Sequence, residues 1–315
     1  MGGILLVNKP ANCTSHDVVT QIRKLFRTKK VGHAGTLDPF ATGLLLLCLD
    51  EATRLSEYLL NAEKEYAAEL KLGETTDTQD RTGRVLETRT VPDFAEDELI
   101  AAIAGFIGEI AQTPPMFSAR KVQGRRLYKL ARKGKTIERA AQAVNIAALD
   151  LLAVELPFLR LRVVCSKGTY IRTLAHDLGA ALGCGASLHA LERTRIGRFA
   201  LKDAVSLAQL AQLPTLADRL RLLLPAEAPL MFLPALTLNA RDAALFVCGT
   251  RIALAAGVVQ EGAAEANPAE PQPEYRIYDG AGQLIALARK IRAETPVGPQ
   301  WLLQPLKVLV PPENA

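Results

Sequence analysis

The chain has 315 residues, 49% of them hydrophobic and 23% charged, and its formal net charge is +5 at pH 7. This length allows a large core and two domains, and the composition excludes an extensively disordered protein. No uninterrupted apolar run approaches the ~20 residues that span a bilayer, and MGGILLVNKP at the N-terminus has no basic region before its apolar run. We therefore expect an untargeted, soluble, cytoplasmic protein.

Short apolar runs near the N-terminus predict two buried strands with a helix between them. ILLV at 4–7 and LLLLCL at 44–49 are the predicted strands. Ser15 is placed to cap a helix over about residues 16–26, whose apolar residues recur at helical spacing. Asp38 stands in a turn before the second run, in GHAGTLDPFATGLLLL, where a carboxylate either caps the turn or does chemistry.

The following segments mix strands with helices. KEYAAELKL at 64–72 alternates with a period of two, which places Tyr66 on the inward face of a strand. DELIAAIAGFIG at 97–108 predicts a helix, and LRLRVVC at 159–165 predicts another strand. That strand leads through SKGT into the helix YIRTLAHDLGAALG, with Arg172 in its first turn and off the apolar stripe.

The C-terminal region changes character near residue 230 and predicts a small β-rich domain from about 236 onward. It contains one short helix, ARDAALFV, and a DGAG turn at 279–282 that indicates a hairpin. The acidic, proline-containing stretch at 261–274 is typical of a solvated loop. The five cysteines are odd in number and form no Cys-X-X-Cys motif, which argues against disulfides and against a structural zinc site.

Positive charge is concentrated in one stretch. RKVQGRRLYKLARKGKTIER at 120–139 holds nine basic residues and one acidic residue, so the rest of the chain is slightly acidic. A polyanion such as RNA would explain this concentration, and a solvated helix face is the plainer alternative. Smaller basic clusters at 23–30 and 193–198 favour nucleic acid.

Four motifs in this order resemble the signature of the bacterial tRNA pseudouridine-55 synthase family. They are GHAGTLDPFATGLL, KEYAAELKLGETTDTQDRTG, QTPPMFSARKVQGRRLYKLARKG and CSKGTYIRTLAHDLG, and the opening ILLVNKPANCTSHDVV is similar to that family's N-terminal motif. The resemblance implies an α+β pseudouridine synthase fold, with a mixed, mainly antiparallel sheet flanked by helices and a small C-terminal PUA-like β-barrel domain. We place the catalytic domain at 1–235, including a basic RNA-binding segment at 112–139, and the C-terminal RNA-binding domain at 236–315.

The resemblance also implies an activity. One uridine of the tRNA T-loop is flipped out, detached from its ribose at N1 and rejoined at C5, without a cofactor or a metal. Asp38 matches the family's catalytic aspartate, and a carboxylate can act on a glycosidic bond as a nucleophile or by charge stabilisation. Arg172 matches the arginine paired with that aspartate, and Tyr66 matches the tyrosine that packs on the uracil. Taken singly, these three residues are as well explained by a turn cap, a surface arginine and a core tyrosine.

Further matches concern RNA binding. His33 matches the histidine that enters the gap left by the flipped base, although a structural histidine in the turn would look the same. Residues that resemble the lining of the uracil pocket are Lys9, Pro10, Tyr170 and Leu191. Basic residues expected to contact phosphates are Arg125, Arg126, Lys129 and Lys133. Asn8, Ala34, Phe117 and Glu192 depart from the family's usual residues, and none of these changes removes Asp38, Tyr66 or Arg172.

Two other functions remain open from the sequence. One is a pseudouridine synthase that acts on a different RNA or within a guide-RNA complex. The other is a module that binds or folds tRNA without catalysis, for which the basic segment would suffice. We expect tRNA as the partner, with no membrane and no obligate protein partner, and a monomer.

Overall fold

The computed structural model describes residues 2–118, 120–122, 124–131, 134–254, 274–295 and 298–310. The chain divides into two compact units, Met1–Leu224 and Pro225–Ala315. No helix in the described part of the chain has the length and hydropathy needed to cross a membrane.

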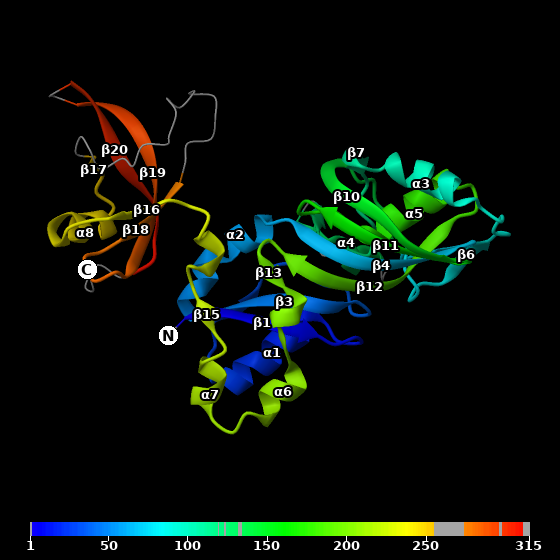
Figure 1. The fold of residues 1–315 in the computed structure, drawn as a ribbon, viewed down its shortest axis with the longest axis horizontal. Coiled ribbons are helices and arrows are strands. Elements are labelled where there is room, and N and C mark those ends of the chain that lie inside the picture. The colour runs from blue at the N-terminus through cyan, green and yellow to red at the C-terminus, as the bar shows by residue number, and fades with distance from the viewer. Residues whose placement is uncertain are drawn as a thin grey trace. The chain divides into compact units, whose positions relative to one another are not determined.

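The first unit is built on a mixed sheet (Figure 1). Its main path follows the order β14-β1-β3-β12-β4-β11-β10-β7. The bounds are β1 Gly3–Lys9, β3 Thr42–Leu49, β4 Lys64–Leu72, β7 Gly108–Gln112, β10 Gln142–Glu155, β11 Phe158–Cys165, β12 Ala186–Ile196 and β14 Val205–Ser206. β1 pairs with β14, and β3 with β12, in parallel, and the other neighbours on this path are antiparallel. The expectation of a mixed, mainly antiparallel sheet is therefore confirmed.

Helices cover the sheet at two places (Figure 1). α1 (Ser15–Phe26), α6 (Leu207–Gln212) and α7 (Leu216–Leu220) lie beside β1 and β3 and share a hydrophobic core with them. α3 (Glu96–Ala104) and α5 (Ile171–Ala181) pack against β4, β11 and β12 around a second core. The candidate catalytic residues come from the edge of this second core, because Leu37, Tyr66 and Ile171 belong to it.

The predicted strands agree closely with the structure. β4 has the predicted bounds, and its buried and half-buried residues alternate along its whole length, with Tyr66 among the buried ones. β1, β3 and β11 each contain the predicted strand, and each is longer by one or two residues at one end or, for β1, at both ends. Alternation and short apolar runs were sufficient here because strand faces follow directly from the period of two.

Helix ends differ from the predictions: α5 ends at Ala181, two residues early, and α1 and α3 differ as follows. α1 is capped by Thr14 and not by Ser15: the Thr14 hydroxyl accepts a hydrogen bond from Asp17 N, and the Asp17 carboxylate accepts one from Thr14 N. This reciprocal capping box uses the acidic residue three positions after the cap, which Ser15 lacks. α3 ends at Ala104, four residues early, because the chain tightens into a turn there and β7 begins at Gly108 with φ +98°.

Smaller elements complete the first unit. They are β2 Val31–His33, a 3₁₀ helix at Asp50–Leu55, α2 Ser56–Asn61, β5 Glu74–Thr76, β6 Val85–Thr88, β8 Lys121–Val122, β9 Arg125–Arg126, α4 Leu127–Ala131, β13 Phe199–Ala200 and a 3₁₀ helix at Leu201–Asp203. The two-residue strand β15, Leu224–Pro225, spans the boundary between the units. β8, β9 and α4 lie in the basic segment, of which the described residues form a short hairpin followed by one helical turn.

The second unit is a β-rich domain, as predicted. Five strands follow the order β16-β18-β19-β20-β17, with bounds Ala235–Thr237, Glu274–Tyr278, Leu284–Thr295, Gly298–Val308 and Ile252–Ala253. The 3₁₀ helix Ala228–Leu230 precedes them, and α8 (Ala240–Val247) matches the predicted ARDAALFV helix. β18 and β19 form the hairpin predicted from DGAG. Of the predicted acidic loop, residues 261–273 lie outside the described residues.

Candidate active site

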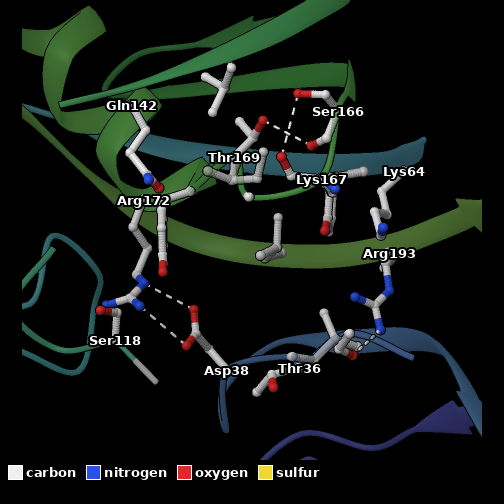
Figure 2. Close-up of a pocket in the computed structure, with 18 of the residues that line it drawn as sticks. Thr36, Asp38, Lys64, Ser118, Gln142, Ser166, Lys167, Thr169, Arg172 and Arg193 are labelled. Atoms are coloured by element: carbon white, nitrogen blue, oxygen red, sulfur yellow. Dashed lines mark hydrogen bonds and ion pairs between the residues drawn. The ribbon is translucent and has the colours of Figure 1, made fainter. Parts of the chain in front are cut away.

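A cavity of about 700 Å³ opens in the first unit where β4, β12, the turn before β3 and the start of α5 meet. Figure 2 shows its polar lining. The turn contributes Asp38, β4 contributes Lys64 and Tyr66, α5 contributes Arg172, and β12 contributes Arg193. Segments far apart in the sequence therefore build one site.

The turn that carries Asp38 is held from α1. The buried Ser15 hydroxyl accepts a hydrogen bond from Leu37 N at 2.9 Å and lies 3.3 Å from Leu37 O. Within the turn, Ala41 N donates to Asp38 O at 3.1 Å. Ser15 is thus occupied in fixing the backbone next to Asp38, which explains why Thr14 and not Ser15 caps the helix.

Lys9 supports the same turn from the end of β1. Its ammonium is fully buried and donates to three backbone oxygens, those of Pro10 (2.9 Å), Cys13 (2.7 Å) and Pro39 (3.3 Å). Neither Lys9 nor Pro10 lines the cavity, although both were matched to pocket-lining positions. Lys9 holds the loop after β1 against the residue that follows Asp38.

Arg172 contacts both oxygens of the Asp38 carboxylate (Figure 2). Its Nε lies 2.9 Å from Oδ2, and its Nη2 lies 3.3 Å from Oδ1. Nη2 also donates to Phe117 O at 2.9 Å, and Nη1 donates to Thr78 O at 3.0 Å. With 4% of its side chain exposed, Arg172 is a buried arginine rather than a surface one. The expected pair is present, and two carbonyls hold its arginine in place.

The start of α5 is fixed so that Arg172 points into the cavity. Tyr170 N donates to Gln112 Oε1 at 2.7 Å, and Gln112 Nε2 donates back to Tyr170 O at 3.0 Å. Gln112, at the end of β7, is 1% exposed. This double hydrogen bond anchors the first residue before the helix to the sheet.

Asp80 is a second carboxylate on Arg172, and it was not among the residues predicted for the site. Its Oδ2 lies 3.6 Å from Arg172 Nη1. Its Oδ1 accepts hydrogen bonds from Thr78 Oγ1 (2.8 Å), Thr82 N (2.9 Å) and Thr82 Oγ1 (2.6 Å). The sequence signal that could have indicated Asp80 was its position in the motif TTDTQDRTG, which is rich in turn-forming polar residues.

The protonation of Asp38 reflects competing effects. Burial raises the pKa of its carboxyl group, Arg172 opposes that rise, and Asp80 adds to it by like-charge repulsion. A third of the Asp38 side chain remains exposed toward the cavity. The turn therefore presents a carboxylate that is paired on one edge and open to a ligand.

Tyr66 lies in the wall of the cavity. It is 9% exposed and lines the cavity from β4. Burial raises the pKa of its hydroxyl, and the Arg193 guanidinium acts in the opposite direction. The hydroxyl therefore stays protonated at neutral pH, and the ring contributes an apolar face to the cavity.

Lys64 and Arg193 were not predicted as site residues. Arg193 is 1% exposed, with Nε donating to Leu44 O at 2.7 Å and Nη2 donating to Gly35 O at 3.1 Å. Lys64 Nζ donates to Leu60 O and Ala62 O, both at 2.6 Å, and burial together with Arg193 lowers its pKa to about 8. Lys64 has the same strand parity as Tyr66, so the alternation of KEYAAELKL would have found it.

The remaining predicted residues fall into three groups. Tyr170 and Leu191 line the cavity. His33, at the end of β2, does not line it, and its buried Nδ1 has no hydrogen-bond partner among the described residues. The side chains of Arg125, Arg126 and Lys129, and all of Lys133, lie outside the described residues.

Comparisons with known proteins agree on one family. The model of the TruB family pseudouridylate synthase N-terminal domain matches residues 23–171, and that of the tRNA pseudouridylate synthase B C-terminal domain matches residues 172–231. The chain is similar to tRNA pseudouridine synthase B of Opitutus terrae, with 50% identity covering 68% of this chain and 89% of the relative. The enzyme of the same name from Cupriavidus metallidurans is 46% identical, covering 91% of this chain and 90% of the relative.

A solved structure has the same fold. It is the crystal structure of a Cbf5-Nop10-Gar1 complex, which matches with a TM-score of 0.72 at 26% identity and covers 99% of this chain and 86% of that one. The fold expectation, including the small β-rich C-terminal domain, is thereby confirmed.

Proposed function

The chain belongs to the TruB family of pseudouridylate synthases, and from that premise we propose that it isomerises uridine 55 in the T-loop of tRNA to pseudouridine. The observation that carries this proposal to particular residues is the Asp38–Arg172 pair at the wall of a cavity that Tyr66 also lines. The geometry supports a catalytic carboxylate because one edge is anchored and the other side faces open space.

The first step is entry of the base. A uridine stacked in the T-loop does not reach Asp38 until it is flipped out of the stack. A cavity of about 700 Å³ is large enough for a nucleoside, and its apolar lining includes Tyr66, Tyr170 and Leu191. His33, five residues before Asp38, is proposed to occupy the gap that the flipped base leaves in the RNA.

The second step is cleavage of the glycosidic bond. Asp38 promotes rupture of the C1′–N1 bond from the ribose side, and Arg172 keeps the carboxylate ionised and oriented. The Thr78 and Phe117 carbonyls accept hydrogen bonds from the guanidinium and hold it beside that carboxylate. The base is then rejoined through C5, and the Tyr66 hydroxyl is placed for a proton transfer.

The partner is proposed to be tRNA, bound in part by the basic segment that includes Arg125, Arg126, Lys129 and Lys133. The Cbf5 structure is a complex with Nop10 and Gar1, whereas the relatives at 46–50% identity carry the name tRNA pseudouridine synthase B. We therefore propose that this chain acts on tRNA as an isolated monomer.

The test is incubation of the purified chain alone with an unmodified tRNA transcript, followed by mapping of pseudouridine at single-nucleotide resolution. We expect pseudouridine at the T-loop uridine and at no other position. Modification only of another RNA, or only with added protein partners, would favour the guide-RNA alternative. Binding without any modification would favour a non-catalytic tRNA-folding module.

A further inference from the structure

The buried charges of the described residues gather around this site. Five charged side chains are buried in the described part of the chain, namely Lys9, Lys64, Asp80, Arg172 and Arg193. With Asp38 they amount to four cations and two carboxylates. Burying charge without an opposite partner is unfavourable in a protein interior. The site therefore holds an excess of positive charge that a ligand can neutralise.

The excess lies away from Asp38. Figure 2 shows Asp38 with Arg172 on one side of the cavity and Lys64 with Arg193 on the other. Among the described residues neither Lys64 nor Arg193 has a carboxylate within ion-pair distance, and both donate to backbone carbonyls instead. One wall of the cavity is thus neutralised, and the opposite wall is cationic.

Both cations are held in place before any ligand arrives. Strand β12 approaches β3 so closely at Arg193 that a Cβ on Gly43 would lie 2.5 Å from Arg193 O. Gly43 has φ +98°, a conformation that favours glycine, and so permits this approach. The guanidinium is then bonded to carbonyls on both sides, and the ammonium of Lys64 is bonded to two carbonyls near the end of α2. Charges fixed in this way need little reorganisation during a reaction.

The reaction creates an anion that a cationic wall of this kind can stabilise. When the C1′–N1 bond breaks, its electron pair stays on the base, so uracil is released as an anion with charge spread over N1 and its carbonyl oxygens. C5 then supplies an electron pair to C1′, the C5 proton leaves, and N1 gains a proton. No oxidant, reductant or co-reactant is needed, and the negative charge on the base exists only between the two bond changes.

We propose that Lys64 and Arg193 form an electrostatic subsite that stabilises the detached uracil anion across the cavity from Asp38. This inference rests on the proposed function, because it requires that Asp38 breaks the glycosidic bond in the same cavity. A backbone phosphate of the RNA is the other anion that could face these cations, and the experiment below separates the two.

The test compares two T-loop RNAs, with uridine or 5-fluorouridine at the target position. Fluorine at C5 withdraws electrons and stabilises the uracil anion, so its cleavage depends less on help from the protein. Variants Lys64→Met and Arg193→Met each remove one cation, and Arg193→Lys keeps the charge. The control is Lys71→Met, the same substitution on the opposite face of β4, where Lys71 is paired with Glu74. Loss of the target nucleoside is measured in single turnover, and RNA affinity separately.

We expect Lys64→Met and Arg193→Met to slow loss of uridine by about 100- to 1,000-fold, the range found when one preorganised electrostatic group is removed. With 5-fluorouridine, the reduction in rate caused by each substitution should be at least about fivefold smaller. Arg193→Lys should recover part of the rate, and Lys71→Met should react at the wild-type rate. If Arg193→Met does not fold, Lys64→Met still gives the result, because methionine keeps the apolar stem.

Equal fold reductions in the single-turnover rate with both substrates would overturn the inference and indicate a structural role. Weaker RNA binding with an unchanged single-turnover rate would overturn it in favour of a phosphate site. Failure of the proposed function itself has a different appearance, because then wild type would convert neither RNA.

Discussion

Asp38 and Arg172 are 134 positions apart in the sequence, yet the guanidinium meets the carboxylate through two contacts, Nε–Oδ2 at 2.9 Å and Nη2–Oδ1 at 3.3 Å. A planar fork on a carboxylate edge fixes the orientation of that carboxylate as well as its charge. The pair is buried on the arginine side and open on the aspartate side. This geometry makes the shape of the guanidinium, and not only its charge, important for the reaction.

Replacing Arg172 by lysine should therefore be severe although the charge is kept. An ammonium cannot contact both carboxylate oxygens and the Thr78 and Phe117 carbonyls at once. We expect the single-turnover rate to fall by at least about 100-fold, within the range for removing a preorganised group, and RNA affinity to change by less than about tenfold. Wild-type turnover by Arg172→Lys would show that only the positive charge matters.

Tyr66→Phe isolates the role of a hydroxyl. The ring that lines the cavity is kept, so RNA affinity should stay close to that of wild type. If the hydroxyl takes part in the proton transfer, product formation should fall by about 100- to 10,000-fold, the range for general acid–base groups. Quenched single-turnover assays with the same RNA check this, and normal rates would reduce Tyr66 to a packing role.

The basic segment predicts a salt-dependent, sequence-independent contribution to binding. Replacing Arg125, Arg126, Lys129 and Lys133 by glutamine should weaken binding to tRNAs of different sequence about equally. The slope of log affinity against log salt should become shallower by roughly 0.7 to 0.9 for each phosphate that the variant no longer neutralises. Titrations of two unrelated tRNAs at several salt concentrations measure this slope. An unchanged slope would indicate that the segment is a solvated helix face that does not contact RNA.

The pH dependence of the single-turnover rate should have two limbs. Burial raises the pKa of Asp38, which works ionised, so the rate should rise with pH on the acid side. Burial lowers the pKa of Lys64 to about 8, and a cationic role means that the rate should fall as pH passes through that value. The raised pKa of Tyr66 keeps its hydroxyl protonated across the same range.

Lys64→Met assigns the alkaline limb. The variant should be slower at pH 7 and should lack the fall near pH 8, while the acid limb stays. An alkaline limb that persists in Lys64→Met at the same pH would have to belong to another group.

Local patterns predicted the elements around the site, because strand alternation and helical spacing depend on neighbouring residues alone. β4 was predicted with its bounds and its inward face, and Tyr66 with it. Helix ends were harder, because Thr14 and Ser15 are both good caps and the choice depends on Asp17 and on the contact of Ser15 with the Asp38 turn.

Long-range contacts could not be predicted from spacing. The Asp38–Arg172 pair was expected only from the family resemblance, since nothing local requires the two to meet. Asp80 joins them through its ion pair with Arg172. Arg193 is buried because β3, β4 and β12 meet around it. Lys64 could have been predicted from the sequence, because it lies on the same buried face of β4 as Tyr66.

The central claim is that the Asp38 carboxylate breaks the glycosidic bond. Its most direct test is Asp38→Asn, which keeps the shape of the side chain and removes the charge, assayed by single-nucleotide mapping of pseudouridine in unmodified tRNA. We expect no pseudouridine above background at the T-loop uridine, with tRNA affinity within about tenfold of wild type, a change of roughly 1.4 kcal/mol or less. Multiple turnover by Asp38→Asn would contradict the account and place the catalytic group elsewhere.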